Sequence, residues 1–197
     1  AKLEIYLKNS TAKAKIVVAS AGTVNTGDFD NLVEIKKLCE KYNAWLHVDA
    51  AFGLFAQCSD QYSTLTEGVA LADSITVDGH KWLNVPYDCG MLFINSAHKR
   101  HQVATFSSVA DYMSKAADEP MNKGIENSRA LRALPVWTAL KAYGQMGYQA
   151  LTERNCEFAK AAAVMLLETG EYILLAPVRL NIVLFQGLGI HTPEENT

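Results

Sequence analysis

A carboxylate and an amine stand just after two similar apolar segments of this chain. Asp49 ends the run Trp45-Leu46-His47-Val48-Asp49, and Lys81 lies just after the run over residues 73–78. Both runs are short, apolar and bounded by small or polar residues, which is typical of buried strands. A buried carboxylate favours a proton on a neighbouring basic nitrogen, and a lysine amine can bind an aldehyde as a Schiff base.

These two groups match the needs of one cofactor, pyridoxal 5'-phosphate. It needs a lysine to hold its aldehyde and a carboxylate to keep its ring nitrogen protonated, so that the ring can act as an electron sink. We therefore expect Lys81 to carry the cofactor and Asp49 to pair with the ring nitrogen. The competing interpretations are a surface lysine that follows a strand and an aspartate that caps a helix.

The elements that position these residues are predicted from apolar runs. Strands are expected over residues 13–20, 45–49, 73–78 and 89–94, with a helix capped by Asp30 between the first two. Short apolar strands that alternate with a helix predict an α/β fold, with a mostly parallel sheet and helices on both faces. Such sheets bind ligands beyond the carboxyl ends of their strands, where Asp49 and Lys81 lie.

The second half of the chain is predicted to be helical after a polar loop. Residues 107–127 are rich in Ser, Ala, Asp, Lys and Gly and are expected to form a mobile loop. Apolar residues at helical spacing follow, and Gly144 is a helix stop. The elements expected after the loop are helices over 128–144 and 148–167 and strands over 171–175 and 180–185.

Composition excludes several other classes of protein. The chain has 197 residues, a net charge of −3 and an apolar fraction of 49%, as in soluble globular proteins. Its basic residues are scattered, and no apolar run approaches the roughly 18–20 residues of a membrane span, so we expect neither nucleic acid nor membrane as a partner. Four cysteines with no CxxC pair predict reduced thiols in a cytoplasmic protein, without a metal site.

Further motifs, in order along the chain, resemble one family. They are Gly22-Thr23 with Phe29-Asp30, Trp45 to Ala51, Ala72-Asp73-Ser74, His80-Lys81-Trp82, Asp88-Cys89, and then Arg129, Arg132, Trp137 and Gly144. Their order and spacing resemble the group II pyridoxal-phosphate-dependent amino acid decarboxylases, which include the aromatic-L-amino-acid and glutamate decarboxylases. One motif alone is a weak signal, whereas the ordered set is specific.

The resemblance implies a fold and a reaction. Residues 1–145 would be part of the large domain of a fold-type-I pyridoxal-phosphate enzyme, and residues 146–197 a connecting helix and the start of a small α+β domain. The parent enzyme would be a homodimer that converts an L-amino acid to an amine and CO2. The family's phosphate-binding turn and ring-stacking histidine would lie upstream, so the chain alone is expected to be catalytically incomplete.

The resemblance also assigns roles to residues around the lysine and the aspartate. Ala51 is expected under the cofactor ring, His80 near the phosphate, and Tyr112 on a loop that closes over the site and protonates Cα. Weaker candidates for cofactor contacts are Thr23 and Ser74. A core alanine, a non-functional histidine and an ordinary loop tyrosine are the competing interpretations.

Four polar residues are left outside the predicted site. Asp78 stands where several relatives have an asparagine that donates to phosphate, and an ionised carboxylate has no hydrogen to donate. Arg129 and Arg132 lie three apart on one helix face and are expected to form structural ion pairs. His47 lies on the opposite face from Val48 and is expected to be structural.

Other activities stay compatible with these residues. Carbon–carbon lyases, aminotransferases and desulfurases that use the same cofactor share the aspartate and the His-Lys pair. Outside enzymes, the alternative is a non-catalytic chain that pairs with a partner subunit. The sequence does not select among amino acid substrates.

Overall fold

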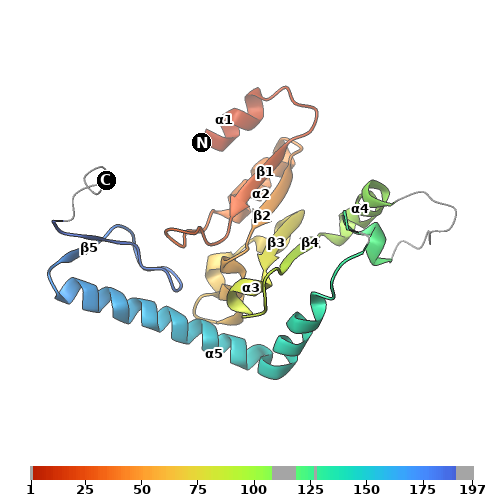
Figure 1. Ribbon diagram of the computed structural model, residues 1–197. Coiled ribbons are helices and arrows are strands. Elements are labelled where there is room, and N and C mark those ends of the chain that lie inside the picture. The colour runs from red at the N-terminus through yellow and green to blue at the C-terminus, as the bar shows by residue number, and fades with distance from the viewer. Residues whose placement is uncertain (1, 108–118, 127, 190–197) are drawn as a thin grey trace, which may run out of the picture.

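The structure is a computed structural model, and it describes residues 2–107, 119–126 and 128–189. Its centre is a four-stranded sheet in the order β1-β2-β3-β4 (Figure 1). The strands are β1 (Ile16–Ser20), β2 (Trp45–Asp49), β3 (Ser74–Asp78) and β4 (Gly90–Ile94). The first three are parallel, and β4 is antiparallel to β3. The predicted mostly parallel sheet is confirmed, and each observed strand falls within its predicted range.

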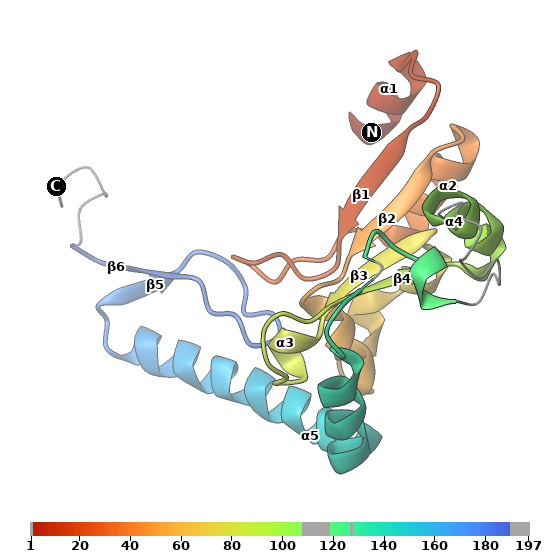
Figure 2. The ribbon, with the colours of Figure 1, turned by 45° about the vertical axis from the view of Figure 1, so that its right-hand side comes forward.

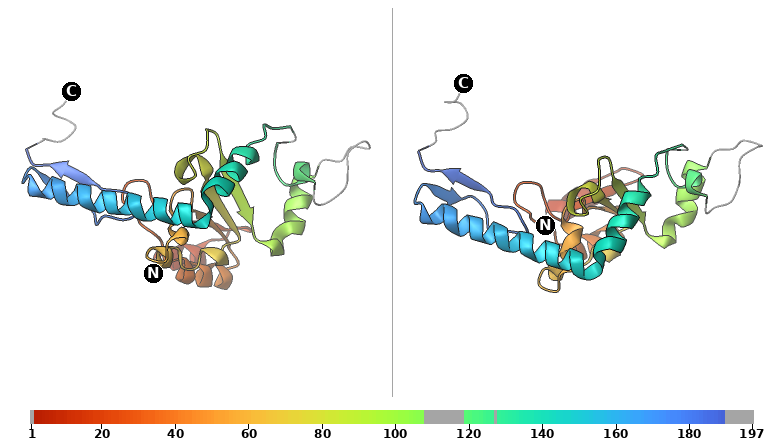
Figure 3. Two further views of the ribbon diagram at one scale, coloured as in Figure 1. Left: turned by 90° about the horizontal axis from the view of Figure 1, so that it is seen from below. Right: turned by 60° about the horizontal axis from the view of Figure 1, so that its bottom comes forward.

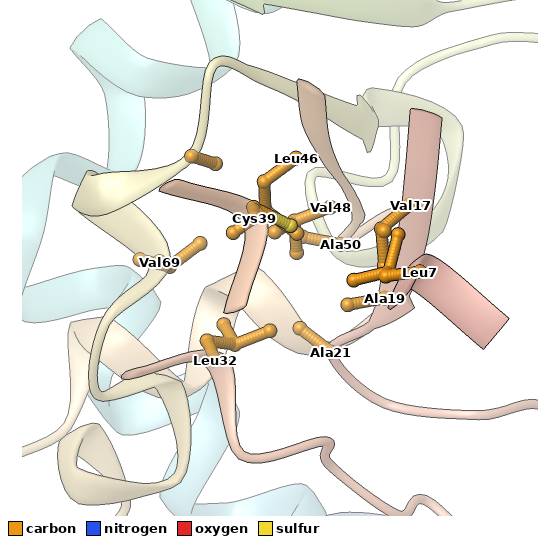
Figure 4. Packing of buried hydrophobic residues seen from close by; sticks show 11 residues of the cluster. Leu7, Val17, Ala19, Ala21, Leu32, Cys39, Leu46, Val48, Ala50 and Val69 are labelled. Carbon is orange, nitrogen blue, oxygen red and sulfur yellow. The ribbon is translucent and has the colours of Figure 1, made fainter. Parts of the chain in front are cut away.

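Apolar side chains on one face of the sheet form the main core. Buried side chains alternate with more exposed ones along β1 and β2, because successive residues of a strand point to opposite faces. Helix α2 (Leu32–Lys41) covers this face, with Leu32 and Cys39 buried against it. Figure 4 shows the cluster, whose buried members are Leu7, Val17, Ala19, Ala21, Leu32, Cys39, Leu46, Val48, Ala50, Val69 and Ala72.

The cap of α2 differs from the prediction by one residue. Asn31 caps the helix, since its Oδ1 accepts the Glu34 N–H at 3.0 Å. The carboxylate of Asp30 instead accepts the Ser20 N–H at 2.7 Å, so it closes the loop that leaves β1. Both residues are good caps, and the choice between them depends on the path of this loop.

The connection from β2 to β3 contains short helices that the sequence did not predict. Three 3₁₀ helices follow β2: η1 (Gly53–Cys58), η2 (Ser63–Thr66) and η3 (Val69–Leu71). A second buried cluster joins this region to the segment after β3 and to the long C-terminal helix. Its members are Phe55, Ala56, Tyr62, Val77, Trp82, Leu83, Val85, Cys89, Tyr148, Cys156 and Leu180.

A 36-residue helix, α5 (Ala133–Glu168), carries the chain past the sheet. Gly144 has φ 60° and ψ −173° inside it, so the two predicted helices form one element that kinks at the predicted stop. The part of α5 after the kink extends away from the sheet alongside β5 (Tyr172–Leu174) and β6 (Phe185–Gly187) (Figures 2 and 3).

The strand predicted over residues 180–185 is misplaced. Leu180 is 2% exposed and has φ 48°, and a bridge between Arg179 and Ile182 makes this stretch a tight turn. β6 therefore begins only at Phe185 and pairs antiparallel with β5. An apolar run was a poor guide here because its buried leucine belongs to a turn.

The remaining elements surround the sheet. They are α1 (Lys2–Asn9), α3 (Gly79–Trp82), η4 (Ser96–His98), α4 (Lys99–Phe106) and η5 (Pro120–Asn122). Among the described residues, no helix is both long and apolar enough to cross a membrane. The four cysteines are free, as the sequence predicted.

Candidate functional site

The three parallel strands bring three polar residues to one edge of the sheet. Ser20, Asp49 and Asp78 are the last residues of β1, β2 and β3, and Ser20 is in register with Asp49. Helix α3 begins directly after β3 and carries Lys81. The predicted placement of the aspartate and the lysine at the carboxyl edge is confirmed.

A cavity of about 530 Å³ opens at this edge of the sheet. It brings together four residues that the sequence proposed for a site, namely Lys81, Asp49, Ala51 and Thr23. The complete lining is Ser20, Gly22, Thr23, Val24, Asp49, Ala51, Phe52, Lys81, Asn181 and Ile182.

The turn that carries Lys81 is held by packing on both sides. The Gly79 N–H donates to the Cys89 carbonyl at 2.8 Å, and a Cβ on Gly79 would lie 2.8 Å from the Cys89 Sγ. Trp82, only 5% exposed, packs between Phe52 and Phe55, with ring centroids 5.6 and 6.4 Å away. The lysine therefore projects from a fixed turn rather than from a free loop.

Lys81 has a carboxylate partner that the sequence left out of the site. Its Nζ lies 3.0 Å from the Asp78 Oδ2, with the two side chains 38% and 20% exposed. The Nε2 of His80 lies 3.5 Å from the same oxygen. The sequence spacing could have predicted this ion pair, because residues three apart across a helical turn, as Asp78 and Lys81 are, lie on one face.

Asp49 lines the cavity, and one of its carboxylate oxygens is hydrogen-bonded. Its Oδ1 accepts the Ala51 N–H at 3.1 Å, and the Ala51 carbonyl accepts the Asp78 N–H at 3.2 Å. The residue is exposed, and the next helix starts at Gly53 with Phe52 at its cap. Asp49 is therefore not a helix N-cap, and its position leaves a carboxylate oxygen available to a ligand.

The Thr23 hydroxyl is committed to its own turn. Thr26 donates to the Asp28 carboxylate at 3.0 Å, so the 2.8 Å contact between the two threonines is a donation from Thr23. The Thr23 Oγ1 also accepts the Asp28 N–H at 3.0 Å. Gly22 enters this turn with φ 89°, where a Cβ would lie 2.8 Å from the Gly53 Cα. Thr23 thus shapes the cavity wall.

Two predicted site residues, His80 and Ser74, do not line the cavity. His80 Nδ1 accepts the Cys89 N–H at 3.1 Å, and its ring stacks on Tyr87 with centroids 4.0 Å apart. Ser74 is the first residue of β3, about 13 Å along the strand from Asp78. Tyr112 lies outside the described residues.

Arg132 forms the structural ion pairs that the sequence predicted for it. Its Nε and Nη2 bind the two oxygens of Asp88 at 2.9 and 3.2 Å, and its Nη1 lies 3.1 Å from Glu126. Hydrogen bonding and charge from Arg132 lower the pKa of Asp88. Asp88 directly precedes Cys89 and β4. The paired hydrogen bonds from Arg132 therefore connect the start of α5 to the segment that supports the lysine turn.

Asn181 and Ile182 line the cavity, and sequence reasoning missed both. They follow Leu180 in the turn beyond α5, which the second buried cluster fixes against the lysine turn. The position of Asn181 and Ile182 near Lys81 depends on the path of the chain through a long helix, so no local sequence motif predicts it.

Comparison with known proteins identifies the family of the chain. Residues 2–187 match the family model described as the pyridoxal-dependent decarboxylase conserved domain. The chain belongs to this family. The match spans almost all the described residues, so the pyridoxal-dependent decarboxylase domain includes the sheet, the cavity and α5.

Individual relatives agree with this family. The chain is 32% identical over 193 residues to an aromatic-L-amino-acid decarboxylase of Bacillus atrophaeus, covering 93% of this chain and 40% of that protein. It is 37% identical over 185 residues to an L-2,4-diaminobutyrate decarboxylase of Rhizobium meliloti, covering 90% and 36%. The crystal structure of Oryza sativa TDC with PLP and tryptamine has the same fold, with a TM-score of 0.80, 22% identity and coverage of 88% and 36%.

The cavity fits the cofactor of this pyridoxal-dependent decarboxylase domain. Its walls carry a primary amine, a small alanine and a carboxylate with one oxygen that has no hydrogen-bond partner among the described residues. These are the groups that an aldehyde, a flat ring and a ring nitrogen require. Its volume lies within the roughly 300–1,000 Å³ of small-molecule sites.

Among the described residues, no group of three or more His, Cys, Asp or Glu side chains could hold a metal ion.

Proposed function

We propose that this chain forms the catalytic part of a pyridoxal-phosphate-dependent enzyme that converts an L-amino acid to an amine and CO2. The observation that carries the proposal is that Lys81 and Asp49, from two different strand–turn units, line one cavity. The family match supports the reaction class. Bound pyridoxal phosphate supplies the electron sink that accepts the electron pair left at Cα when the carboxylate departs.

Lys81 would hold the cofactor through its side-chain amine in this proposal. Its Nζ, 3.0 Å from the Asp78 carboxylate, is the amine that would hold the aldehyde group of the cofactor. The fixed turn between Gly79 and Trp82 keeps the amine aimed at one point of the cavity, so that the incoming substrate amine meets a positioned partner.

Asp49 keeps a proton on the ring nitrogen. A carboxylate next to a pyridinium favours the protonated ring, and this charge strengthens the electron sink. The Ala51 N–H on Oδ1 orients the carboxylate so that Oδ2 can face the ring. The small side chain of Ala51 leaves room for the ring to lie flat against this wall.

In this proposal the cavity does not hold the substrate carboxylate with a strong cationic group. None of the residues that line it in the described part of the chain is an arginine. A carboxylate without a strong cationic partner is poorly stabilised in its ionised form, which favours its loss as CO2. Tyr112 is the proposed donor of the proton that then reaches Cα.

Product analysis tests the reaction class. The holoenzyme should release equimolar amine and CO2 from one amino acid. The screen begins with aromatic L-amino acids and L-2,4-diaminobutyrate, because these are the substrates in the names of the two relatives. An aldehyde without CO2 would indicate a carbon–carbon lyase, and a keto acid an aminotransferase. Cofactor binding without any product would indicate a non-catalytic chain.

We also propose that the enzyme is a cytoplasmic homodimer that does not bind nucleic acid. Free cysteines support a reducing compartment, and scattered basic residues with a net charge of −3 oppose binding to nucleic acid. The domain boundary near residue 145 would fall at the kink of α5, so that residues 146–197 begin the small domain. Sedimentation of the holoenzyme tests the dimer.

A further inference from the structure

A chain of polar side chains crosses the face of the sheet next to Asp49. The Trp45 Nε1–H donates to the Ser74 Oγ at 2.8 Å, and the Ser74 Oγ lies 2.8 Å from the His47 Nδ1. The His47 Nε2 lies 3.0 Å from the Thr76 Oγ1. None of these side chains has a role in the proposed reaction so far. The pairing of β2 with β3 does not require them either, because backbone hydrogen bonds join the two strands.

The indole N–H fixes the direction of the first hydrogen bond, and the tautomer of His47 sets the direction of the others. An indole N–H can only donate, so Ser74 accepts from Trp45 and has one hydrogen left to give. His47 Nδ1 lies 2.8 Å from the Ser74 Oγ, and it accepts that hydrogen in the tautomer that is protonated on Nε2. His47 then carries its hydrogen on Nε2 and donates it to the Thr76 Oγ1. The Thr76 hydroxyl is left with its own hydrogen to donate.

The register of the sheet places Asp49 next to that hydrogen. Thr76 is the direct partner of Asp49 on the neighbouring strand, as Ser74 is the partner of His47. Neighbouring strands lie about 4.8 Å apart, and paired residues point to the same face. The Asp49 Oδ1 is occupied by the Ala51 N–H, whereas Oδ2 has no hydrogen-bond partner among the described residues.

We propose that His47 and Thr76 are positioning residues that orient and stabilise the Asp49 carboxylate. In this proposal the Thr76 hydroxyl donates to the Asp49 Oδ2 when the site is loaded, and the hydrogen bond from His47 fixes the direction in which it donates. A hydrogen bond donated to a carboxylate favours the ionised form of the carboxylate. It also restricts the orientation in which the carboxylate can contact the ring nitrogen. This inference rests on the proposed function, because it assigns Asp49 the ring nitrogen as its partner.

The test compares ring protonation in variants of the holoenzyme. The probe is pyridoxal phosphate labelled with 15N in its ring, observed by NMR, with kcat, KM and the melting temperature measured in parallel. Thr76→Val removes the hydroxyl and Thr76→Ser retains it, while His47→Phe keeps an aromatic ring without nitrogens. We expect Thr76→Val and His47→Phe to move the 15N signal toward the deprotonated ring and to lower kcat roughly tenfold, as loss of an outer-shell hydrogen bond does elsewhere. Thr76→Ser should restore both.

Asp49→Asn is the reference that separates two kinds of failure. If its 15N signal does not move, Asp49 is not the ring partner and the proposed role of Asp49 fails. If the signal moves in Asp49→Asn but stays at the wild-type position in Thr76→Val, the positioning role alone is overturned, whatever the melting temperature does. Should Thr76→Val not fold, His47→Phe decides by the same measurement, because it interrupts the chain one residue earlier.

Discussion

Replacing Asp78 by asparagine should tighten binding of the cofactor. The amine of Lys81 must leave the Asp78 carboxylate before it can bind an aldehyde, so the ion pair opposes loading of the site. The two atoms are 3.0 Å apart, but the side chains are 38% and 20% exposed, and solvent therefore screens the attraction. We take the pair to contribute about 1 kcal/mol, the upper end for partly exposed pairs. At 1.4 kcal/mol per tenfold, Asp78→Asn should lower the dissociation constant about fivefold.

The assay is a titration of the apoenzyme with pyridoxal phosphate at constant pH and ionic strength, followed by absorbance. Asp60→Asn is the matched control, because it removes one negative charge from an exposed position that does not line the cavity. Asp78→Glu retains the charge and should bind as the wild type does. Equal or weaker binding by Asp78→Asn, with Asp60→Asn unchanged, would refute the reasoning that this ion pair competes with the cofactor.

Three other predictions follow from the site and the core. Asp49→Asn should retain cofactor but lower kcat by roughly a hundred- to several-thousand-fold, as loss of about 3–5 kcal/mol implies for a charge pair that the bound cofactor buries; a wild-type kcat would exclude its role at the ring nitrogen. Tyr112→Phe should still release CO2 but divert product from amine to carbonyl compounds, whereas normal amine yield would assign the proton to another donor. Burial opposes the charge of Asp73, but hydrogen bonds from the Leu46 N–H, His98 and Lys36 outweigh it and lower the pKa of Asp73. Asp73→Asn should therefore cost about 1–3 kcal/mol of unfolding free energy at pH 7. In urea melts this difference should shrink as the pH falls below about 4, where the wild-type carboxylate also loses its charge, and a pH-independent difference would contradict it.

The sheet and the edge that holds the candidate site were predictable because they depend on local patterns. Short apolar runs end at Asp49 and Asp78, and parallel strands must present those ends at one edge. The lysine follows one of these strands within a single helical turn, so its place near Asp49 required no knowledge of distant segments.

The rest of the site depends on contacts between distant segments. Asn181 reaches the cavity only because the segment after β5 returns the chain to the lysine turn, and the misplaced strand before Phe185 reflects a buried Leu180 at positive φ. The partners of His80 and Ser74 were also hidden, because a backbone N–H from Cys89 and an indole N–H from Trp45 leave no mark in a motif. Residue type indicated that these side chains were polar, and the packing decided what they bind.

Covalent capture of the cofactor tests the central assignment most directly. Borohydride reduction of the holoenzyme should abolish its visible absorbance band and fix a pyridoxyl group on the protein. Peptide mapping by mass spectrometry should then locate this group on Lys81, and Lys81→Ala should not be labelled. A pyridoxyl group on any other lysine, with Lys81 unmodified, would contradict the assignment of the cavity at the end of β2 and β3 as the pyridoxal phosphate site.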